Sequence, residues 1–184
     1  GDLIPDDSEG YRDSDGDGVA DYLDAIGVCH LLAATPAQED NFIVETEYGN
    51  CLQTSIFADA ASAGAELMPE QVASDEDTRH VGTLYGVVVS ALPVPGAAVD
   101  FVLPQRQPLP QNALYRKYIK DQWQDLDTQG DDAVASALGS RGYCPAPGSE
   151  LWQPGLAAGH WCVQLTLTDG GANDADGIIN GSIV

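Results

Sequence analysis

The chain has 184 residues, of which 43% are apolar, enough to bury the core of one domain. Its 29 acidic and 7 basic residues give a formal net charge of -22, which disfavours nucleic acid and anionic membrane surfaces as partners. No apolar run approaches the length of a membrane span, so we expect no direct membrane insertion.

The most informative stretch is residues 13–24, DSDGDGVADYLD, which has the register of a twelve-residue calcium loop. Carboxylates occupy positions 1, 3, 5, 9 and 12, a backbone carbonyl is available at position 7, and a glycine at position 6 permits the sharp turn. The ligands in chain order are Asp13, Asp15, Asp17, Val19, Asp21 and Asp24. Because these carboxylates repel one another, we predict that Ca²⁺ gives the segment its shape, the alternative being a solvated acidic linker.

The flanks of this loop argue against an EF-hand, since residues 4–10 and 25–29 lack helical length and periodicity. The pattern DxDxDGxxDxxD ends in Asp rather than Glu and resembles a thrombospondin type-3 repeat, an extracellular calcium-wrapped connector. We therefore expect residues 1–25 to form an acidic calcium-binding arm and residues 26–184 to form the folded domain.

The four cysteines form no CxxC motif and fall into two local pairs. The simplest prediction is disulfides Cys29–Cys51 and Cys144–Cys162, each stabilising the fold by roughly 3 kcal/mol. A zinc site that uses the adjoining His30 and His160 is the alternative. Disulfides, a calcium loop and strong acidity together indicate an oxidising extracellular compartment.

Alternating apolar and polar residues predict several short strands, at 41–48, 52–57, 84–91, 97–103, 113–119 with a hairpin partner beginning at Trp123, 160–168 and 178–184. In the strand at 160–168, apolar residues occupy one face and Cys162 the other. We expect residues 84–125 to form a β-meander, with the proline-rich segment 104–110 as an edge or connection. Residues 58–65 fit either a loop or a short helix.

Residues 131–140, DDAVASALGS, are the best helix candidate, with Asp131 or Asp132 as the cap and Gly139 as the stop. About eight short strands separated by turns nevertheless predict an all-β fold. The expected architecture is an antiparallel, immunoglobulin-like β-sandwich that carries the N-terminal calcium loop.

The C-terminal stretch repeats part of the calcium register. Asp174, Asp176 and Asn180 fall at positions 3, 5 and 9, and Asp169 or Asn173 is available to complete the ligand set. The sequence therefore predicts a second calcium site here, and the alternative is an Asx- and glycine-rich turn between two strands.

Several stretches together are similar to the bacterial choice-of-anchor U domain: DYLDAI, NFIVETEYGNCL, PLPQNALYRKY followed by WQDL, YCPAPG and LTDGGANDADGIINGSIV. The resemblance implies a secreted module displayed on the cell surface, in a polypeptide that continues to a sorting tail. It supplies no catalytic residues.

Enzyme motifs are absent from the sequence: there is no GxSxG, HExxH, P-loop or dinucleotide-binding pattern, and the three histidines are isolated. We expect a non-enzymatic, calcium-stabilised structural or adhesive module of a bacterial surface protein or fibre, which contacts a neighbouring domain, a copy of itself, or a surface glycan or protein. The alternatives are a filament subunit that uses its acidic arm or terminal strand, a glycan-binding module with stacking tryptophans, and a calcium-dependent hydrolase. A basic cluster between residues 106 and 120 forms either a pairing surface for an acidic neighbour or a solvated strand face.

Overall fold

The computed structural model describes residues 16, 27–35, 42–57, 64–76 and 78–184. Within these ranges the fold is all-β apart from one short 3-10 turn, η1 (Pro69–Gln71). Every pairing between named strands is antiparallel. The prediction of an all-β, antiparallel protein is therefore confirmed.

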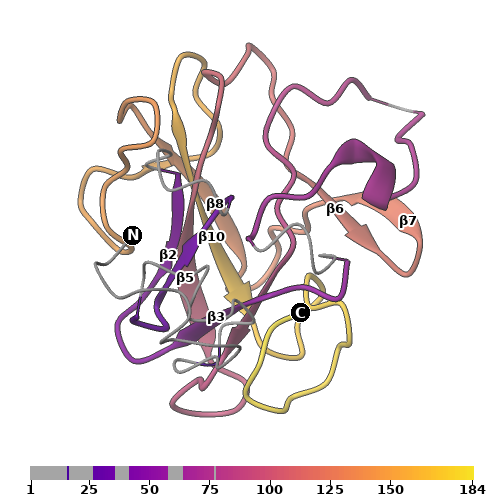
Figure 1. The fold of residues 1–184 in the computed structure, drawn as a ribbon, viewed down its shortest axis with the longest axis vertical. Helices are drawn as coiled ribbons and strands as arrows, with labels where there is room; N and C mark the ends of the chain where they lie inside the picture. Colours follow the sequence, from indigo (N-terminus) through magenta and orange to yellow (C-terminus); the bar gives the residue numbers. More distant parts are fainter. Residues whose placement is uncertain (1–15, 17–26, 36–41, 58–63, 77) are drawn as a thin grey trace, which may run out of the picture.

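The main element is a six-stranded sheet with the order β1-β2-β5-β10-β8-β9 (Figure 1). Its strands are β1 (Leu31–Ala33), β2 (Ile43–Thr46), β5 (Ala98–Pro104), β10 (Cys162–Thr168), β8 (Ala133–Ala137) and β9 (Gln153–Pro154). The central strand β10 pairs with β5 from Cys162 opposite Pro104 to Thr168 opposite Ala98.

The alternation predicted for residues 160–168 is confirmed in β10. Val163, Leu165 and Leu167 belong to the hydrophobic core, where they lie opposite Leu103, Phe101 and Val99 of β5. The intervening side chains point to the opposite face because successive residues of a strand alternate. Cys162 therefore points away from the face that carries Val163, Leu165 and Leu167, and on the opposite face it forms the disulfide with Cys144.

Two small antiparallel pairs accompany the main sheet. β3 (Cys51–Thr54) pairs with β4 (Val87–Ser90), and Leu52 and Val89 of this pair belong to the same core. β6 (Arg116–Ile119) and β7 (Gln122–Asp125) form a hairpin to one side of the main sheet (Figure 1). Lys120 and Asp121 make its two-residue turn with φ of 53° and 60°, the left-handed conformation that tight hairpins require.

The predicted helix at residues 131–140 is wrong, because this segment contains strand β8. Its residues Ala133–Ala137 pair with β10, and Val134 packs against the core. Asp132 caps no helix; its carboxylate accepts a hydrogen bond from the backbone of Thr168 at the end of β10. Long-range pairing thus overrides the weak helical propensity of a short alanine-rich segment.

The predicted meander over residues 84–125 is also wrong, since β4 pairs with β3 whereas β5 pairs with β2 and β10. The expected terminal strand at 178–184 is reduced to one bridge between Ile183 and Val89. Carboxylates of Asp169, Asp174 and Asp176 accept hydrogen bonds from backbone amides of this segment in place of a β-ladder, as described below. The proline-rich segment begins inside β5, which ends at Pro104.

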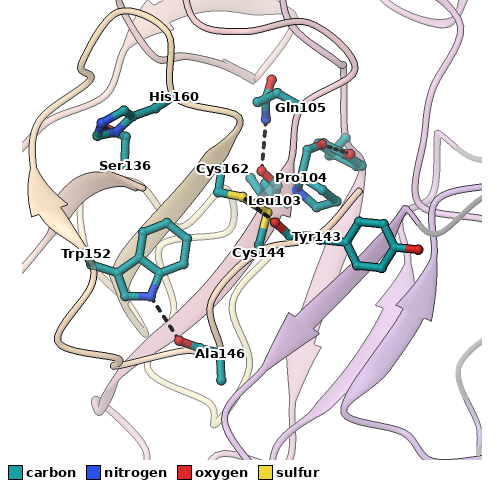
Figure 2. Close-up of a disulfide and its surroundings, with 11 residues drawn as sticks. Leu103, Pro104, Gln105, Ser136, Tyr143, Cys144, Ala146, Trp152, His160 and Cys162 are labelled. Carbon is teal, nitrogen blue, oxygen red and sulfur yellow. Dashed lines mark hydrogen bonds between the residues drawn. A yellow bond between two sulfur atoms is a disulfide. The ribbon is translucent and has the colours of Figure 1, made fainter. Parts of the chain in front are cut away.

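Both predicted disulfides are confirmed. Cys29–Cys51 ties the chain before β1 to β3, with Cα atoms 4.6 Å apart. Cys144–Cys162 ties the loop after β8 to β10, with Cα atoms 5.6 Å apart (Figure 2). All the cysteines are thereby paired, so the alternative of a cysteine-ligated zinc site is wrong.

Candidate functional site

The N-terminal calcium loop lies almost entirely outside the described residues. This applies to Asp13, Asp15, Asp17, Val19, Asp21 and Asp24. The described member, Gly16, accepts a hydrogen bond at its carbonyl from the side-chain amide of Gln53 in β3, at 2.9 Å. The calcium site at this loop stays a prediction.

In the C-terminal loop, the buried carboxylate of Asp169 is surrounded by backbone N–H groups. Gly96 donates to it at 2.7 Å, Asn180 at 3.1 Å and Gly181 at 2.8 Å. Burial opposes ionisation, but these hydrogen bonds outweigh it and hold the pKa of Asp169 below its ordinary value. Asp169 thus joins the start of β5 to the end of the chain.

Asp174 and Asp176 make similar hydrogen bonds in the same loop. Asp174 accepts from the backbone of Gly170 at 2.8 Å and of Val184 at 3.0 Å. Burial, with a contribution from the neighbouring Asp176, raises the pKa of Asp174 above its ordinary value. The carboxylate of Asp176 accepts from Ile178 N at 2.7 Å and from the Asn180 amide at 3.0 Å.

Asn173 occupies the centre of a buried polar network. Its amide nitrogen donates to the carbonyl of Asp127 and to the carboxylate of Asp132, while its amide oxygen accepts from Lys117. This places the predicted C-terminal ligands together in one loop but directs their oxygens at protein donors. Across the described residues, no group of three or more His, Cys, Asp or Glu side chains is arranged to hold a metal ion. The second calcium site stays a prediction.

A cavity of about 690 Å³, which the sequence did not predict, lies against the core face of the main sheet. Core residues of β5 and β10, such as Phe101 and Leu165, form part of its wall. Further parts of the wall come from β4, from residues 55–57, 78–86 and 107–114, and from the β6–β7 hairpin. Its lining is therefore drawn from segments far apart in the sequence.

Four aromatic rings meet along this cavity in an unbroken row. The centroids of Phe57 and Tyr118 are 5.9 Å apart, those of Tyr118 and Trp123 5.3 Å, and those of Trp123 and His80 4.4 Å. All four line the cavity. The tilted and edge-on arrangements are those that aromatic pairs prefer, so the rings support one another across three chain segments.

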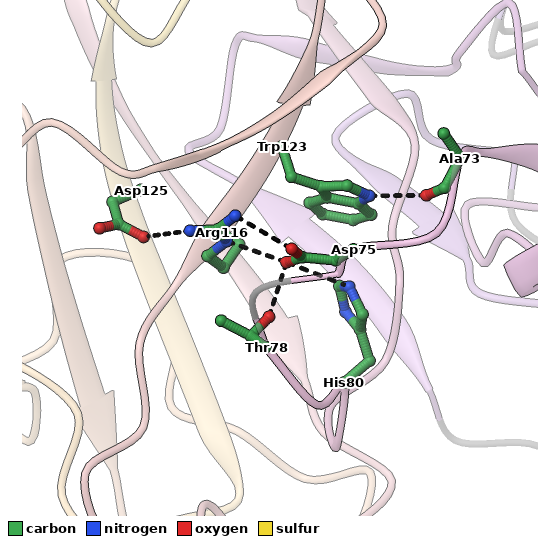
Figure 3. Close-up of polar contacts among 7 residues, drawn as sticks. All are labelled: Ala73, Asp75, Thr78, His80, Arg116, Trp123 and Asp125. Atoms are coloured by element: carbon green, nitrogen blue, oxygen red, sulfur yellow. Dashed lines mark hydrogen bonds and ion pairs between the residues drawn. The ribbon is translucent and has the colours of Figure 1, made fainter.

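One wall of the cavity is locked to the hairpin through the Asp75 carboxylate (Figure 3). Asp75 accepts hydrogen bonds from Arg116 at 3.0 and 3.1 Å and from the Thr78 hydroxyl at 2.6 Å, and its side chain is 2% exposed. The ring of His80 lies 3.6 Å away, and the indole of Trp123 donates to the carbonyl of Ala73 at 2.7 Å. These contacts hold Ala73, Asp75 and His80 against β6 and β7.

Arg116 has a second partner, Asp125, directly opposite it in the hairpin at 2.7 Å. The hydrogen bond with Asp125, then that with Asp75, raises the pKa of Arg116 against the opposing effect of burial. Two further residues of the basic cluster are also engaged within the chain. Arg106 binds the Glu66 carboxylate and stacks on the Phe42 ring at 4.4 Å, and Lys117 donates to Asn173.

Ser136 and His160 form a buried pair near the Cys144–Cys162 disulfide (Figure 2). The Ser136 hydroxyl donates to the carbonyl of Gly155 at 2.8 Å, accepts from the backbone of Ala157 at 2.9 Å, and lies 3.0 Å from His160 Nδ1. The pair therefore attaches β8 to the loop before β10.

No protein-family model, curated protein or solved structure matches this chain. In the part of the chain that the structure describes, no helix is long and apolar enough to cross a lipid bilayer. The two disulfides are compatible with an extracellular or secreted protein, since such bonds persist in oxidising compartments.

Proposed function

We propose that this chain is a non-enzymatic, calcium-stabilised module that serves a structural or adhesive role in an extracellular protein or fibre of the bacterial cell surface. The observation that carries the proposal is the pair of disulfides, each of which fixes an irregular segment to a strand. Such bonds suit a protein that must keep its shape outside the cell, where neither chaperones nor a reducing pool is available.

The arrangement of the strands supports an immunoglobulin-like β-sandwich as the architecture of this module. β3, β4 and the C-terminal Ile183 contribute to the core against the face formed by β5 and β10. In such a sandwich, the β3–β4 pair would belong to the layer that faces the main sheet. The resemblance to choice-of-anchor U domains agrees with this role.

The use of polar groups in the described residues also favours a structural role. His30 lies against Tyr48, His80 against Asp75, and His160 against Ser136, so the three histidines serve three separate contacts. Ser136, the hydroxyl beside a histidine, is fully buried and committed to the backbone. A nucleophile must reach its substrate, which this hydroxyl does not.

The calcium-loop register of residues 13–24 supports the proposed calcium binding. Extracellular calcium modules bind with dissociation constants of about 10⁻⁴ to 10⁻³ M, which matches millimolar calcium outside cells. The ion would convert a self-repelling arm into a compact joint between this domain and a neighbouring domain or copy. The C-terminal loop around Asp174 is the candidate for a second ion.

Surface labelling tests the proposed role. Antibodies raised against the purified chain should label intact cells of the source organism, and non-reducing peptide maps of the native protein should contain both cross-links. Labelling that requires permeabilised cells, together with free thiols at Cys29 or Cys162 in the native protein, would contradict it.

A further inference from the structure

We propose that the cavity beside the β6–β7 hairpin binds an amphipathic organic anion, with the apolar body of the ligand in the cavity and its negative group at the rim, against Arg79 and Lys120. This binding activity goes beyond the structural role proposed above and does not depend on it.

The size and the walls of the cavity fit the apolar body. Its volume of about 690 Å³ falls within the range of about 300 to 1,000 Å³ that holds small organic ligands. Side chains such as Leu103, Val163 and Leu167 form its inner end, and the aromatic row from Phe57 to His80 follows one side. An alkyl chain or a ring placed there exchanges water for apolar contact.

Tyr115 forms part of the cavity wall. Its side chain lines the cavity and is partly accessible, yet burial raises the pKa of its phenol well above the ordinary value. Tyr115 therefore presents a neutral phenol ring to the cavity.

The charges around the cavity are the reverse of those of the whole chain. Arg79, Arg116, Lys117 and Lys120, four of the 7 basic residues, line it, and Asp121 is the one acidic side chain among the described lining residues. The whole chain has a formal net charge of -22. Arg116 is already paired with carboxylates, so Arg79 and Lys120 are the charges that favour an anion over a cation as the ligand.

Two of these cations are available to a ligand. Arg116 is engaged by Asp75 and Asp125, and Lys117 by Ala172 and Asn173. Arg79 and Lys120 have no ion-pair partner within the described residues and are exposed, so they lie at the rim of the cavity they line. A carboxylate or sulfonate group can pair with either of them without breaking an ion pair among the described residues.

The site is largely formed before a ligand arrives. Contacts with Arg116 and Trp123 hold Ala73, Asp75 and His80 against the hairpin, so the aromatic wall keeps its place when the cavity is empty (Figure 3). Preorganisation of this kind lowers the entropic cost of binding.

Calorimetric titration with dodecanoate, below its micelle concentration, tests the proposal, with dodecanol and dodecyltrimethylammonium as neutral and cationic probes of equal chain length. Dodecanoate should bind saturably and change the fluorescence of Trp123, the tryptophan that lines the cavity. The cationic probe should bind at least about tenfold more weakly because the rim repels it. Absence of saturable dodecanoate binding, or equal affinity for the two charged probes, would overturn the proposal.

Variants separate the rim from the cavity. Arg79→Gln with Lys120→Gln should weaken dodecanoate binding about tenfold and leave dodecanol binding unchanged. The matched control is Arg141→Gln, which removes an exposed base outside the cavity and should bind like the original chain. Val87→Phe keeps a strand-forming residue in β4, fills part of the cavity and should weaken all three probes. Equal losses in the rim and Arg141 variants, or unchanged binding in a folded Val87→Phe protein, would contradict the site.

Discussion

Two buried carboxylates in this molecule are stabilised in opposite ways. Asp169 in the C-terminal loop receives three backbone N–H groups, whereas Asp75 at the cavity wall receives the guanidinium of Arg116 and a hydroxyl. With 29 acids and 7 bases, the chain cannot give each acid a basic partner. The comparison shows that backbone amides supply the missing partners in the glycine-rich loop, and that the scarce arginines are used where a wall must be fixed to a hairpin.

The largest effect is expected for Asp169→Ala, which leaves three backbone N–H groups of a buried loop without an acceptor. The free energy of unfolding should fall by about 3 kcal/mol, because hydrogen bonds to an ionised group contribute about 1.5 to 3 kcal/mol and their unpaired partners remain buried. Urea denaturation monitored by tryptophan fluorescence measures this loss. Asp131→Ala, which removes an exposed aspartate, is the control and should stay within about 0.5 kcal/mol of the original chain.

Protonation of the Asp169 carboxylate should lower the free energy of unfolding at acid pH. Its pKa is lower in the folded state than in the unfolded state, so its stabilisation is complete above the ordinary aspartate pKa and is lost as the pH falls through the lowered value. Asp169→Asn should flatten the dependence of stability on pH below about 4. If the free energy of unfolding of this variant depends on acid pH as steeply as that of the original chain, other groups cause the dependence.

The Asp75 site should give the next largest effect. Asp75→Ala leaves Arg116 with one exposed partner and should lower the free energy of unfolding by about 2 kcal/mol. Asp125→Ala removes the other partner of the same arginine, but its side chain is 66% exposed, so the loss should stay below about 0.5 kcal/mol. Added salt should reduce the Asp125 effect and leave the Asp75 effect nearly unchanged, since a buried pair is poorly screened. Equal losses from both variants would contradict the locking role of Asp75.

Asp174 should give a smaller effect with the opposite dependence on pH. Its pKa is raised in the folded state, so its ionisation works against folding, and the stability of the original chain relative to Asp174→Asn should decrease as the pH rises through the raised pKa. Thermal melts of both proteins from acid to neutral pH measure this. A calcium ion at the loop would cancel this penalty in the original chain alone, so melts with calcium and with a chelator also test the second calcium site.

How much of this molecule is predictable from its sequence depends on the range of the interactions. The disulfides and strand β10 were predicted, since cysteine spacing and a period of two are local signals. Strand β8 was mistaken for a helix because what decides its conformation is its pairing with β10, some thirty residues away in the chain. The cavity escaped prediction for the same reason, since no spacing in the sequence brings Phe57, His80 and Trp123 together.

The residues of the C-terminal loop illustrate a second limit. Side-chain oxygens at calcium spacing can bind the ion, but they can also accept hydrogen bonds from the backbone of a turn-rich loop. A sequence does not say which of these contacts the oxygens make. Asp169 was predicted as a possible ligand and proves to hold the loop to the start of β5. Asp169 holds the loop in place through the backbone N–H of Gly96, and no local sequence pattern links Gly96 with Asp169.

Calcium titration by calorimetry tests the central claim, a calcium-stabilised module, most directly. The original chain should bind calcium with a dissociation constant of about 10⁻⁴ to 10⁻³ M. Combined Asp13→Asn, Asp15→Asn and Asp17→Asn substitutions should abolish this site, whereas the Asp174→Asn and Asp176→Asn pair should retain it. A chain that takes up no calcium in this range, or that binds it equally well after the three N-terminal substitutions, would contradict the account.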